Sequence, residues 1–278
     1  ETFLCNFNPD VVIATHFLAS DVISNLKKVD RLKTKLITCV TDFRMHSFWF
    51  AEQTDYFCVG FLETQMDLIR KWGVSPKKIN IVGIPIHSKF YEAKNKEDVC
   101  NRLHLSKEVF TILITGGGFG VGPIKDLLKV LIRMKDPFQI LIVCGHNAKL
   151  REEIDKVITH TVRLPTIVKT FGFVDYIDEL MSISDVCITK AGGLISSEAL
   201  AKELPLIISS PIPGQEGRNC RLLLLNKAAF RLNRTSQLKK IIKKIYSNDR
   251  LRRTLIENIR KIKKQNPTMN ISKFALSI

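Results

Sequence analysis

The sequence lacks the features that mark several classes of protein. Among its 278 residues there is no apolar run of 18 or more, so we expect no membrane-spanning helix. The first ten residues have neither a basic region nor an apolar core, which predicts that there is no signal peptide. The chain opens on Glu1 and not on Met, which we interpret as a processed, cloned or incomplete N-terminus.

No Cys-x-x-Cys pair occurs among the seven cysteines, and an odd number cannot pair completely within the chain. Several of them lie in apolar runs that read as strands, such as Cys144 and Cys187. This pattern predicts buried free thiols in a reducing cytosol and argues against a disulfide framework or a zinc site. Hydrophobic residues make up 45% and charged residues 25% of the chain, a balance typical of a globular protein and not of a disordered one.

Positive charge is concentrated at one end of the chain. Of the net charge of +16, the last 48 residues supply most, with 14 basic and 2 acidic side chains. Such a block suits an anionic surface, either phospholipid or nucleic acid, and an exposed helix face without a partner is the alternative. Nucleic acid is the weaker option, because the block has no interleaved aromatic residue beyond Tyr246 and no nucleic-acid-binding motif.

Short continuous apolar runs alternate with amphipathic stretches along most of the chain. Continuous runs are typical of strands buried on both faces of a parallel sheet. We predict strands at residues 11–14, 35–40, 56–59, 79–82, 110–114, 139–143, 167–170, 186–189, 206–209 and 229–232. We predict helices at residues 18–29, 63–72, 124–134, 148–157, 175–183, 194–202, 215–225, 237–246 and 250–264.

The alternation pauses at Gly83–His87 and in the charged stretch 92–98, which we interpret as a connection between two domains. The fold class predicted is therefore α/β, with two successive βα domains that each contain a parallel sheet. We place the first domain at residues 1–87, the second at 88–258 and a basic helical tail at 259–278.

Three loops of the second domain follow strands and open helices. The first is a glycine-rich loop that includes Gly117 and Gly118; it is neither a P-loop nor a dinucleotide-binding motif. In the second, Gly192, Gly193 and Ser196 can hold a phosphate at a helix N-terminus, and Glu198 can accept the hydroxyls of a ribose.

The third loop ends in Gln215 and Glu216, an amide and a carboxylate that suit the hydroxyls of a hexose. All three loops lie after the carboxyl ends of strands, which is where open α/β sheets bind their ligands. For each motif taken alone, a purely structural role is the alternative: a tight turn for the glycines, or a favourable charge at a helix dipole for Glu198.

Taken in order, these motifs resemble the donor domain of the processive diacylglycerol glucosyltransferases and monogalactosyldiacylglycerol synthases. The resemblance rests on five segments: Gly116–Pro123, Val143–Asn147, Gly172–Val174, Ile188–Ala199 and Pro213–Glu216. The family is similar to the N-acetylglucosaminyltransferase that forms lipid II. It implies the GT-B fold, here with an incomplete N-terminal domain, because the family's N-terminal Gly-Gly-His loop has no match before Pro9.

The resemblance also implies roles for the matched residues. Phe173 and Val174 would hold the uracil, Gly192 and Gly193 the pyrophosphate, and Glu198 the ribose. Gln215 and Glu216 would hold the donor sugar. For the general base we consider three polar residues of the first domain that lie after strands or in the loop beyond: His16, Asp42 and His46. A buried or surface polar residue without a catalytic role is the alternative for each.

The resulting hypothesis is an inverting enzyme that transfers a hexose from a UDP-sugar to diacylglycerol or a glycosyl-diacylglycerol. We expect no cofactor and no metal, since the chain has no Asp-x-Asp motif. We expect the partners to be the UDP-sugar, the lipid and an anionic membrane reached through the basic tail, with the protein cytoplasmic and peripheral on the inner face. Two alternatives stay open: transfer to a polyprenyl-linked cell-wall acceptor, and nucleotide-sugar binding without turnover.

Overall fold

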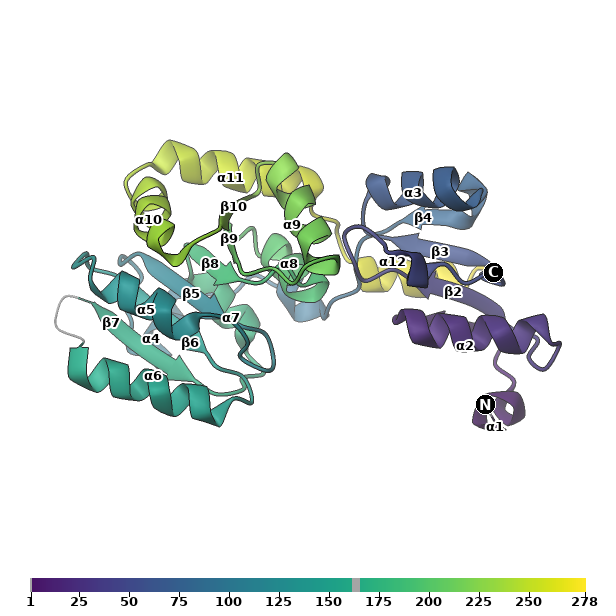
Figure 1. Cartoon of the computed structure of the whole chain (residues 1–278), viewed down its shortest axis with the longest axis horizontal. Coiled ribbons are helices and arrows are strands. Elements are labelled where there is room, and N and C mark those ends of the chain that lie inside the picture. Colours follow the sequence, from purple (N-terminus) through teal and green to yellow (C-terminus); the bar gives the residue numbers. More distant parts are fainter. Residues whose placement is uncertain (1, 162–165) are drawn as a thin grey trace. The chain divides into compact units, whose positions relative to one another are not determined.

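The computed structural model describes residues 2–161 and 166–278. The chain forms two compact units, Glu1–Ser88 with Lys264–Ile278, and Lys89–Lys263. Each unit has a parallel β-sheet with helices packed on it (Figure 1). The predicted α/β class with two parallel-sheet domains is therefore confirmed.

The first unit has a four-stranded sheet in the order β1-β2-β3-β4. Its strands are β1 (Val11–Ala14), β2 (Lys35–Cys39), β3 (Tyr56–Val59) and β4 (Ile79–Ile81). Its helices are α1 (Thr2–Phe7), α2 (Phe17–Lys28), α3 (Leu62–Trp72) and α12 (Pro267–Ala275). Gly73 ends α3 in the left-handed conformation that glycine adopts without strain.

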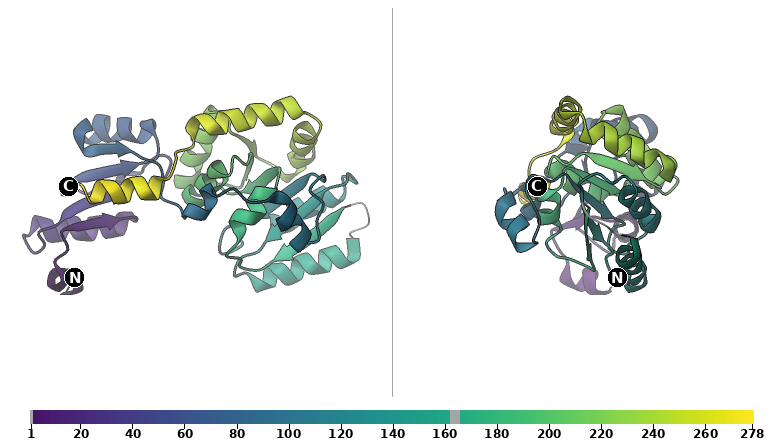
Figure 2. Two further views of the ribbon diagram at one scale, coloured as in Figure 1. Left: turned by 180° about the vertical axis from the view of Figure 1, so that it is seen from behind. Right: turned by 90° about the vertical axis from the view of Figure 1, so that its left-hand side faces the viewer.

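Side chains on the two faces of this sheet belong to different core clusters. Leu36 packs with α2, and Phe57 packs with α3. Ile37, Cys39 and Cys58 point to the opposite face, where Ile271 of α12 covers them. The last helix of the chain thus completes the first unit, as the view from behind in Figure 2 shows.

The C-terminal segment reaches this sheet through a close crossing at Gly83. A Cβ atom at this position, where φ is +103°, would lie 2.7 Å from side-chain atoms of Lys264 and of Pro267. The hydroxyl of Thr268 donates a hydrogen bond of 2.7 Å to the carbonyl of Ile86. The structure thus differs from the predicted division at the C-terminal end: residues 264–278 are part of the first unit and do not form a separate tail.

In its described residues, the second unit has a six-stranded sheet with five α-helices in the βα repeats and three others. Its strands are β5 (Thr111–Thr115), β6 (Gln139–Val143), β7 (Ile167–Phe171), β8 (Val186–Thr189), β9 (Leu206–Ser209) and β10 (Ala229–Leu232). Its helices are α4 (Lys96–Arg102), α5 (Ile124–Ile132), α6 (Ala148–Thr161), α7 (Ile177–Ile183), α8 (Gly193–Ala201), α9 (Gln215–Leu225), α10 (Leu238–Tyr246) and α11 (Asp249–Ile262).

Part of the stretch interpreted as a connection is helical. Asn95 caps α4 by accepting a hydrogen bond of 3.0 Å from the backbone N–H of Glu97. Residues 96–98 therefore form the start of α4, the first helix of the second unit. Helices α5, α6 and α10 pack on one face of the sheet, while α7 and α8, with α4 and α11 packed against them, lie on the other (Figure 1).

The strand order of the second unit is β10-β9-β8-β5-β6-β7. The sheet therefore grows outward from β5 in both directions, and the switch lies between β5 and β8, as in dinucleotide-binding folds of Rossmann type. In such sheets ligands bind beyond the carboxyl ends of the strands on either side of the switch. The glycine-rich loop follows β5, and Lys190–Gly193 follows β8.

All seven cysteines are free, and six of them are buried, with Cys5 partly exposed. The predicted buried free thiols are thus confirmed for these six. In the described parts of the chain, no helix is both long enough and apolar enough to cross a bilayer. Nor do three or more His, Cys, Asp or Glu side chains gather there in a way that could hold a metal ion.

Candidate functional site

The glycines of the loop after β5 divide into two groups. Packing requires glycine at Gly116, where a Cβ atom would lie 2.5 Å from backbone atoms of Val121 in the same loop. It also requires glycine at Gly120 and at Gly145 of the loop after β6, where a Cβ atom would lie 2.2 Å from a backbone oxygen of the other loop. At Gly117, Gly118 and Gly122, no heavy atom of the described residues lies within 4 Å of an added Cβ, and Gly122 has a φ of +138°. Gly117 has a φ of +73°, which itself favours glycine, whereas Gly118 has neither a positive φ nor a close neighbour. Close approach of a ligand would explain Gly118.

Replacing Gly118 with Ala should leave the protein folded and weaken UDP binding by roughly 1 kcal/mol or more, because the added methyl occupies the space in which a phosphate would approach the backbone. Gly120→Ala is the matched control: its Cβ would lie 2.2 Å from the carbonyl oxygen of Cys144, so it should lose more than about 1 kcal/mol of stability. Thermal melting and calorimetry with UDP measure both. Unchanged UDP binding by a folded Gly118→Ala variant would show that this glycine does not contact the ligand.

The start of α8 brings together the second group of predicted residues. Gly192 is the N-cap of the helix, Gly193 its first residue, and both are partly exposed at the sheet edge. Ser196 lies on the buried face of α8 with Ala199, and its hydroxyl has no hydrogen-bond partner among the described residues. The glycines therefore leave backbone N–H groups available at the helix N-terminus, while the Ser196 hydroxyl is buried.

Glu198 follows one turn into α8 and is only partly exposed. Burial raises the pKa of its carboxyl to about 7, nearby Lys89 opposes the shift, and buried Asp178 adds to it. Asp178 is itself within 3.7 Å of Lys89 and 3.3 Å of Lys94. A desolvated carboxylate whose charge is incompletely balanced gains from hydroxyl donors, which is what a ribose offers.

This shifted pKa predicts a pH dependence of binding. If ribose hydroxyls donate to the Glu198 carboxylate, the ligand prefers the ionised form, so affinity should rise as pH increases through about 7. Between pH 6 and pH 8 we expect an increase of about tenfold for UDP-glucose. Each of its phosphates has one ester and one anhydride bond, so neither has the second ionisation near pH 6 that the terminal phosphate of UDP has. Titration calorimetry at each pH tests this, and Glu198→Gln should flatten the profile; an equally steep profile in that variant would assign the titration to another group.

An aromatic pair lies beyond β6 and β7. Phe173 is 61% exposed, and its ring stacks on that of His146, with 4.4 Å between centroids and 13° between planes. Val174 follows it and is partly exposed. The predicted uracil-binding residue is thus an exposed aromatic ring supported from behind by His146, a residue that sequence analysis did not single out.

The start of α9 holds Gln215 and Glu216. Gln215 is exposed. One carboxylate oxygen of Glu216 accepts a hydrogen bond of 2.7 Å from the backbone N–H of Ile212, and the other lies 3.7 Å from Nζ of Lys190. About one turn into the helix, buried Asn219 donates a hydrogen bond of 2.9 Å to the carbonyl of Ala191 and so ties α9 to the loop after β8. Neither Lys190 nor Asn219 was a predicted site residue, although both lie within four residues of one.

The three base candidates of the first unit lie around two aromatic side chains. The ring of Phe17 is 4.3 Å from that of His16 and 5.2 Å from that of His46. The fully buried carboxylate of Asp42 accepts a hydrogen bond of 2.9 Å from Nε1 of Trp49, and Nε2 of His46 lies 3.8 Å from the same oxygen.

These contacts rank the candidates. His16 caps α2, where its Nδ1 accepts a hydrogen bond of 3.2 Å from the backbone N–H of Leu18, so the proton of the neutral ring is on Nε2. Asp42 is out of reach of solvent. His46 keeps 14% of its side chain exposed beside a carboxylate, which makes it the best placed of the three to accept a proton.

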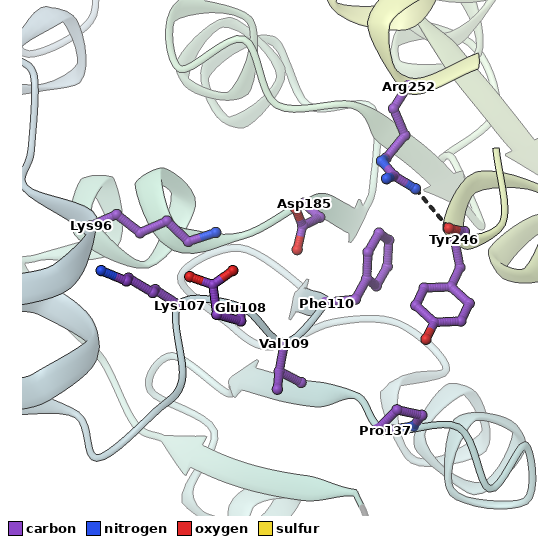
Figure 3. A pocket seen from close by; sticks show the side chains of 9 residues that line it. All are labelled: Lys96, Lys107, Glu108, Val109, Phe110, Pro137, Asp185, Tyr246 and Arg252. Atoms are coloured by element: carbon purple, nitrogen blue, oxygen red, sulfur yellow. Dashed lines mark hydrogen bonds between the residues drawn. The ribbon is translucent and has the colours of Figure 1, made fainter. Parts of the chain in front are cut away.

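A pocket lies at the edge of the second sheet opposite to these loops and is shown in Figure 3. Phe110, Pro137 and Asp185 each precede a strand, so this pocket is at the amino ends of β5, β6 and β8. Two of its charged groups have structural partners: Asp185 accepts a hydrogen bond of 2.7 Å from the N–H of Thr111, and Arg252 donates one of 2.7 Å to the carbonyl of Tyr246. An open α/β sheet does not bind its ligands at this edge.

Comparison with known proteins agrees with this architecture. Residues 95–262 match the model of the family described as "Glycosyl transferases group 1", and residues 1–86 match that of "Monogalactosyldiacylglycerol (MGDG) synthase". The solved structure of MurG from Acinetobacter baumannii is similar, with a TM-score of 0.75 at 14% identity over 100% of this chain and 76% of that one. Anabaena Alr3699/HepE in complex with UDP-glucose has a TM-score of 0.65 at 15% identity, over 100% and 82%.

Two Rossmann-like units with parallel sheets, one with its candidate site at the topological switch, define the GT-B class of glycosyltransferase fold, as predicted. The chain belongs to the Glycosyl transferases group 1 family. Among curated relatives it is 30% identical over 264 residues to a processive diacylglycerol beta-glucosyltransferase of Bacillus cytotoxicus, covering 95% of this chain and 66% of the relative. With that of Bacillus cereus (strain AH187) it shares 32% over 212 residues, covering 76% and 53%. The chain thus spans between half and two thirds of the length of these relatives.

Proposed function

We propose that this chain binds a UDP-hexose at the carboxyl edge of its second sheet and serves in transferring the hexose to diacylglycerol or a glycosyl-diacylglycerol. The observation that carries the proposal is Glu198: a desolvated carboxylate one turn behind the exposed N–H groups of Gly192 and Gly193, at the edge where a Rossmann-like sheet binds nucleotides. The names of the curated relatives and the family model matched by residues 1–86 support the choice of lipid.

The chemistry divides between the two units. In the second, Phe173 would stack on uracil, Glu198 would accept the ribose hydroxyls, and the loop glycines would donate backbone N–H groups to the diphosphate. In the first, His46 would take the proton of the acceptor hydroxyl. An exposed apolar side chain beside this histidine suits a lipid: Phe48 is 70% exposed, and its ring lies 5.6 Å from that of His46.

An assay with the full chain tests the proposal. Radiolabelled UDP-glucose is incubated with vesicles that contain either diacylglycerol or a polyprenyl phosphate-linked acceptor, and the lipid fraction is extracted. We expect label in the diacylglycerol sample. Label only in the polyprenyl sample would favour the second acceptor, for which the support is a fold likeness to MurG at 14% identity. UDP release without lipid labelling, or nucleotide binding without turnover, would contradict the transfer.

We further propose that helix α10 attaches the protein to an anionic membrane, on the inner face of the bilayer. Leu238, Ile242 and Ile245 are fully buried against the core. Lys239, Lys240, Lys243 and Lys244 are exposed on the remaining surface of the same helix. In the described structure, none of these four lysines pairs with a carboxylate, so their charges are available to phospholipid headgroups.

Helix α11 is a poorer candidate than its composition indicates. Arg260 and Lys263 both bind Glu203, and Arg252 binds Asp249 while capping the last carbonyls of α10. These three cations have partners within the chain, whereas Arg250, Arg253 and Lys261 are exposed and form no ion pair in the described structure. We choose α10 because all four of its lysines are exposed and unpaired.

A further inference from the structure

Two cysteines lie side by side in the sheet of the first unit. Cys39 of β2 and Cys58 of β3 are register partners on neighbouring parallel strands, so their side chains project from the same face. Both are 1% exposed, and both are free thiols. Neighbouring strands lie about 4.7–4.9 Å apart, within the Cα separation of about 4.4–6.8 Å that a disulfide spans. No other two cysteines are register partners in the described strands.

The two thiols interact with each other. Cys39 donates a hydrogen bond to the sulfur of Cys58, which raises the pKa of the Cys39 thiol and lowers the pKa of the Cys58 thiol. Asn80 of β4 continues the same row as the register partner of Cys58, and its amide nitrogen is buried without a hydrogen-bond partner among the described residues. The Cys58 sulfur therefore has a thiol donor on one side and an unused amide donor on the other. Both favour its thiolate, so Cys58 is the nucleophilic sulfur of the pair.

Helix α12 shields this row from solvent through a small contact. Of its nine residues, Pro267 and Ile271 are buried, and Ile271 belongs to the same core cluster as the two cysteines. Toward the end of the helix, the ring of Phe274 lies 5.1 Å from that of Tyr56. A short helix with so few buried side chains opens locally at a lower free energy than the sheet beneath it. The thiols are thus covered by an element that can move away while the strands stay paired.

We propose that Cys39 and Cys58 are a redox-active pair, which hydrogen peroxide oxidises to a disulfide when α12 lifts from the sheet. The Cys58 thiolate attacks one peroxide oxygen, breaks the O–O bond and becomes a sulfenic acid. The hydroxide that leaves takes up the proton lost by the Cys58 thiol and becomes water. The Cys39 sulfur then attacks the sulfenic sulfur, forms the S–S bond and releases a second water. The two sulfurs together lose two electrons, which the peroxide gains.

Peptide mapping of the full chain tests the pair. After treatment with hydrogen peroxide, the remaining thiols are alkylated and the protein is digested with trypsin without reduction. Cys39 and Cys58 fall in separate tryptic peptides, residues 36–44 and 45–70, which we expect to be joined. Dithiothreitol should separate them readily, because the strand spacing exceeds the Cβ separation of about 3.8 Å that a disulfide prefers, and a strained bond is easily reduced. In Cys39→Ser, dimedone should label Cys58 as the sulfenic acid, whereas Cys39 should stay unlabelled in Cys58→Ser.

Variants of α12 test its role as a cover. Ile271→Ala should raise the rate of disulfide formation at least about tenfold, because the helix loses its main apolar contact with the sheet and opens more often. Met269→Ala is the matched control: Met269 is 55% exposed on the same helix, so the rate should stay within about twofold of the wild type. Thr268→Val, which removes the hydrogen bond to Ile86, should give an intermediate rate and replaces Ile271→Ala if that variant does not fold. Thermal melting checks the folding of each variant.

Three results would overturn the proposal in whole or in part. Peptides that stay unlinked in folded Ile271→Ala would overturn the redox pair, as would a disulfide that joins either cysteine to a third one. Equal rates of disulfide formation in the wild type, Ile271→Ala and Thr268→Val would overturn the role of α12. Dimedone labelling of Cys39 in Cys58→Ser, with none of Cys58 in Cys39→Ser, would overturn the assignment of Cys58 as the nucleophile.

Discussion

Reversing Lys239, Lys240, Lys243 and Lys244 to Glu is expected to abolish binding of the full chain to anionic vesicles. Each lysine near an anionic leaflet contributes about 1 kcal/mol, so losing four costs about 4 kcal/mol before the repulsion of the new carboxylates is added. The buried side of α10 is unchanged by the substitutions, since all four lysines are exposed and Leu238, Ile242 and Ile245 form the core contact. UDP binding should therefore persist.

Co-sedimentation with vesicles at fixed salt measures this, and a variant of equal charge is the control. Arg133, Lys135, Lys149 and Lys156 are exposed residues of the same unit that form no ion pair in the described structure. Reversing these four to Glu should reduce sedimentation far less. Equal losses in the two variants would mean that net charge and not α10 governs attachment, and competition by duplex DNA would show whether the surface prefers nucleic acid.

Glu198→Ala is expected to weaken UDP binding by about 1.5–3 kcal/mol, because a hydrogen-bonded charged group is removed from a desolvated place. The loss should be the same for UMP as for UDP, since the missing partner is the ribose.

The same titration should lower the stability of the unliganded protein as pH rises, whereas it should raise the affinity for the ligand. Glu198 has a pKa of about 7 in the folded chain, above its usual value of 4.5, so it favours unfolding as pH rises from about 4.5 to 7. Glu198→Gln removes this titration and should make the unliganded protein at least as stable at pH 8 as the wild type. Denaturant unfolding at pH 5 and pH 8 checks it; a clear loss of stability at pH 8 would mean that the carboxylate stabilises the fold.

The strands of both sheets follow from the sequence because their burial on two faces leaves continuous apolar runs. The strands Gln139–Val143 and Val186–Thr189 were predicted to the residue for this reason. Helix α12 lies within the predicted helical tail, but its packing against the sheet of the first unit was not predicted. Its buried face is small, centred on Ile271, and the surface that it covers is formed by Cys39 and Cys58, more than 200 residues earlier in the chain.

The candidate site also contains residues that could be predicted from the sequence and residues that could not. Glycines at strand ends and a carboxylate one helical turn later are local patterns, so Gly118, Gly192 and Glu198 could be found by reading along the chain. The stacking of His146 on Phe173 and the pairing of Lys190 with Glu216 depend on which strands are neighbours. The position of Lys190 in the sequence could have drawn attention to it, since it directly follows β8 and precedes the Gly192-Gly193 pair.

Hydrogen–deuterium exchange of the full chain with and without UDP tests most directly that the nucleotide site is at the carboxyl edge of the second sheet. We predict that UDP protects peptides covering residues 115–123, 189–198 and 210–219. Peptides covering residues 105–111 and 246–252, at the opposite edge shown in Figure 3, should be unaffected. Protection confined to the opposite edge, or none at saturating UDP, would contradict the account.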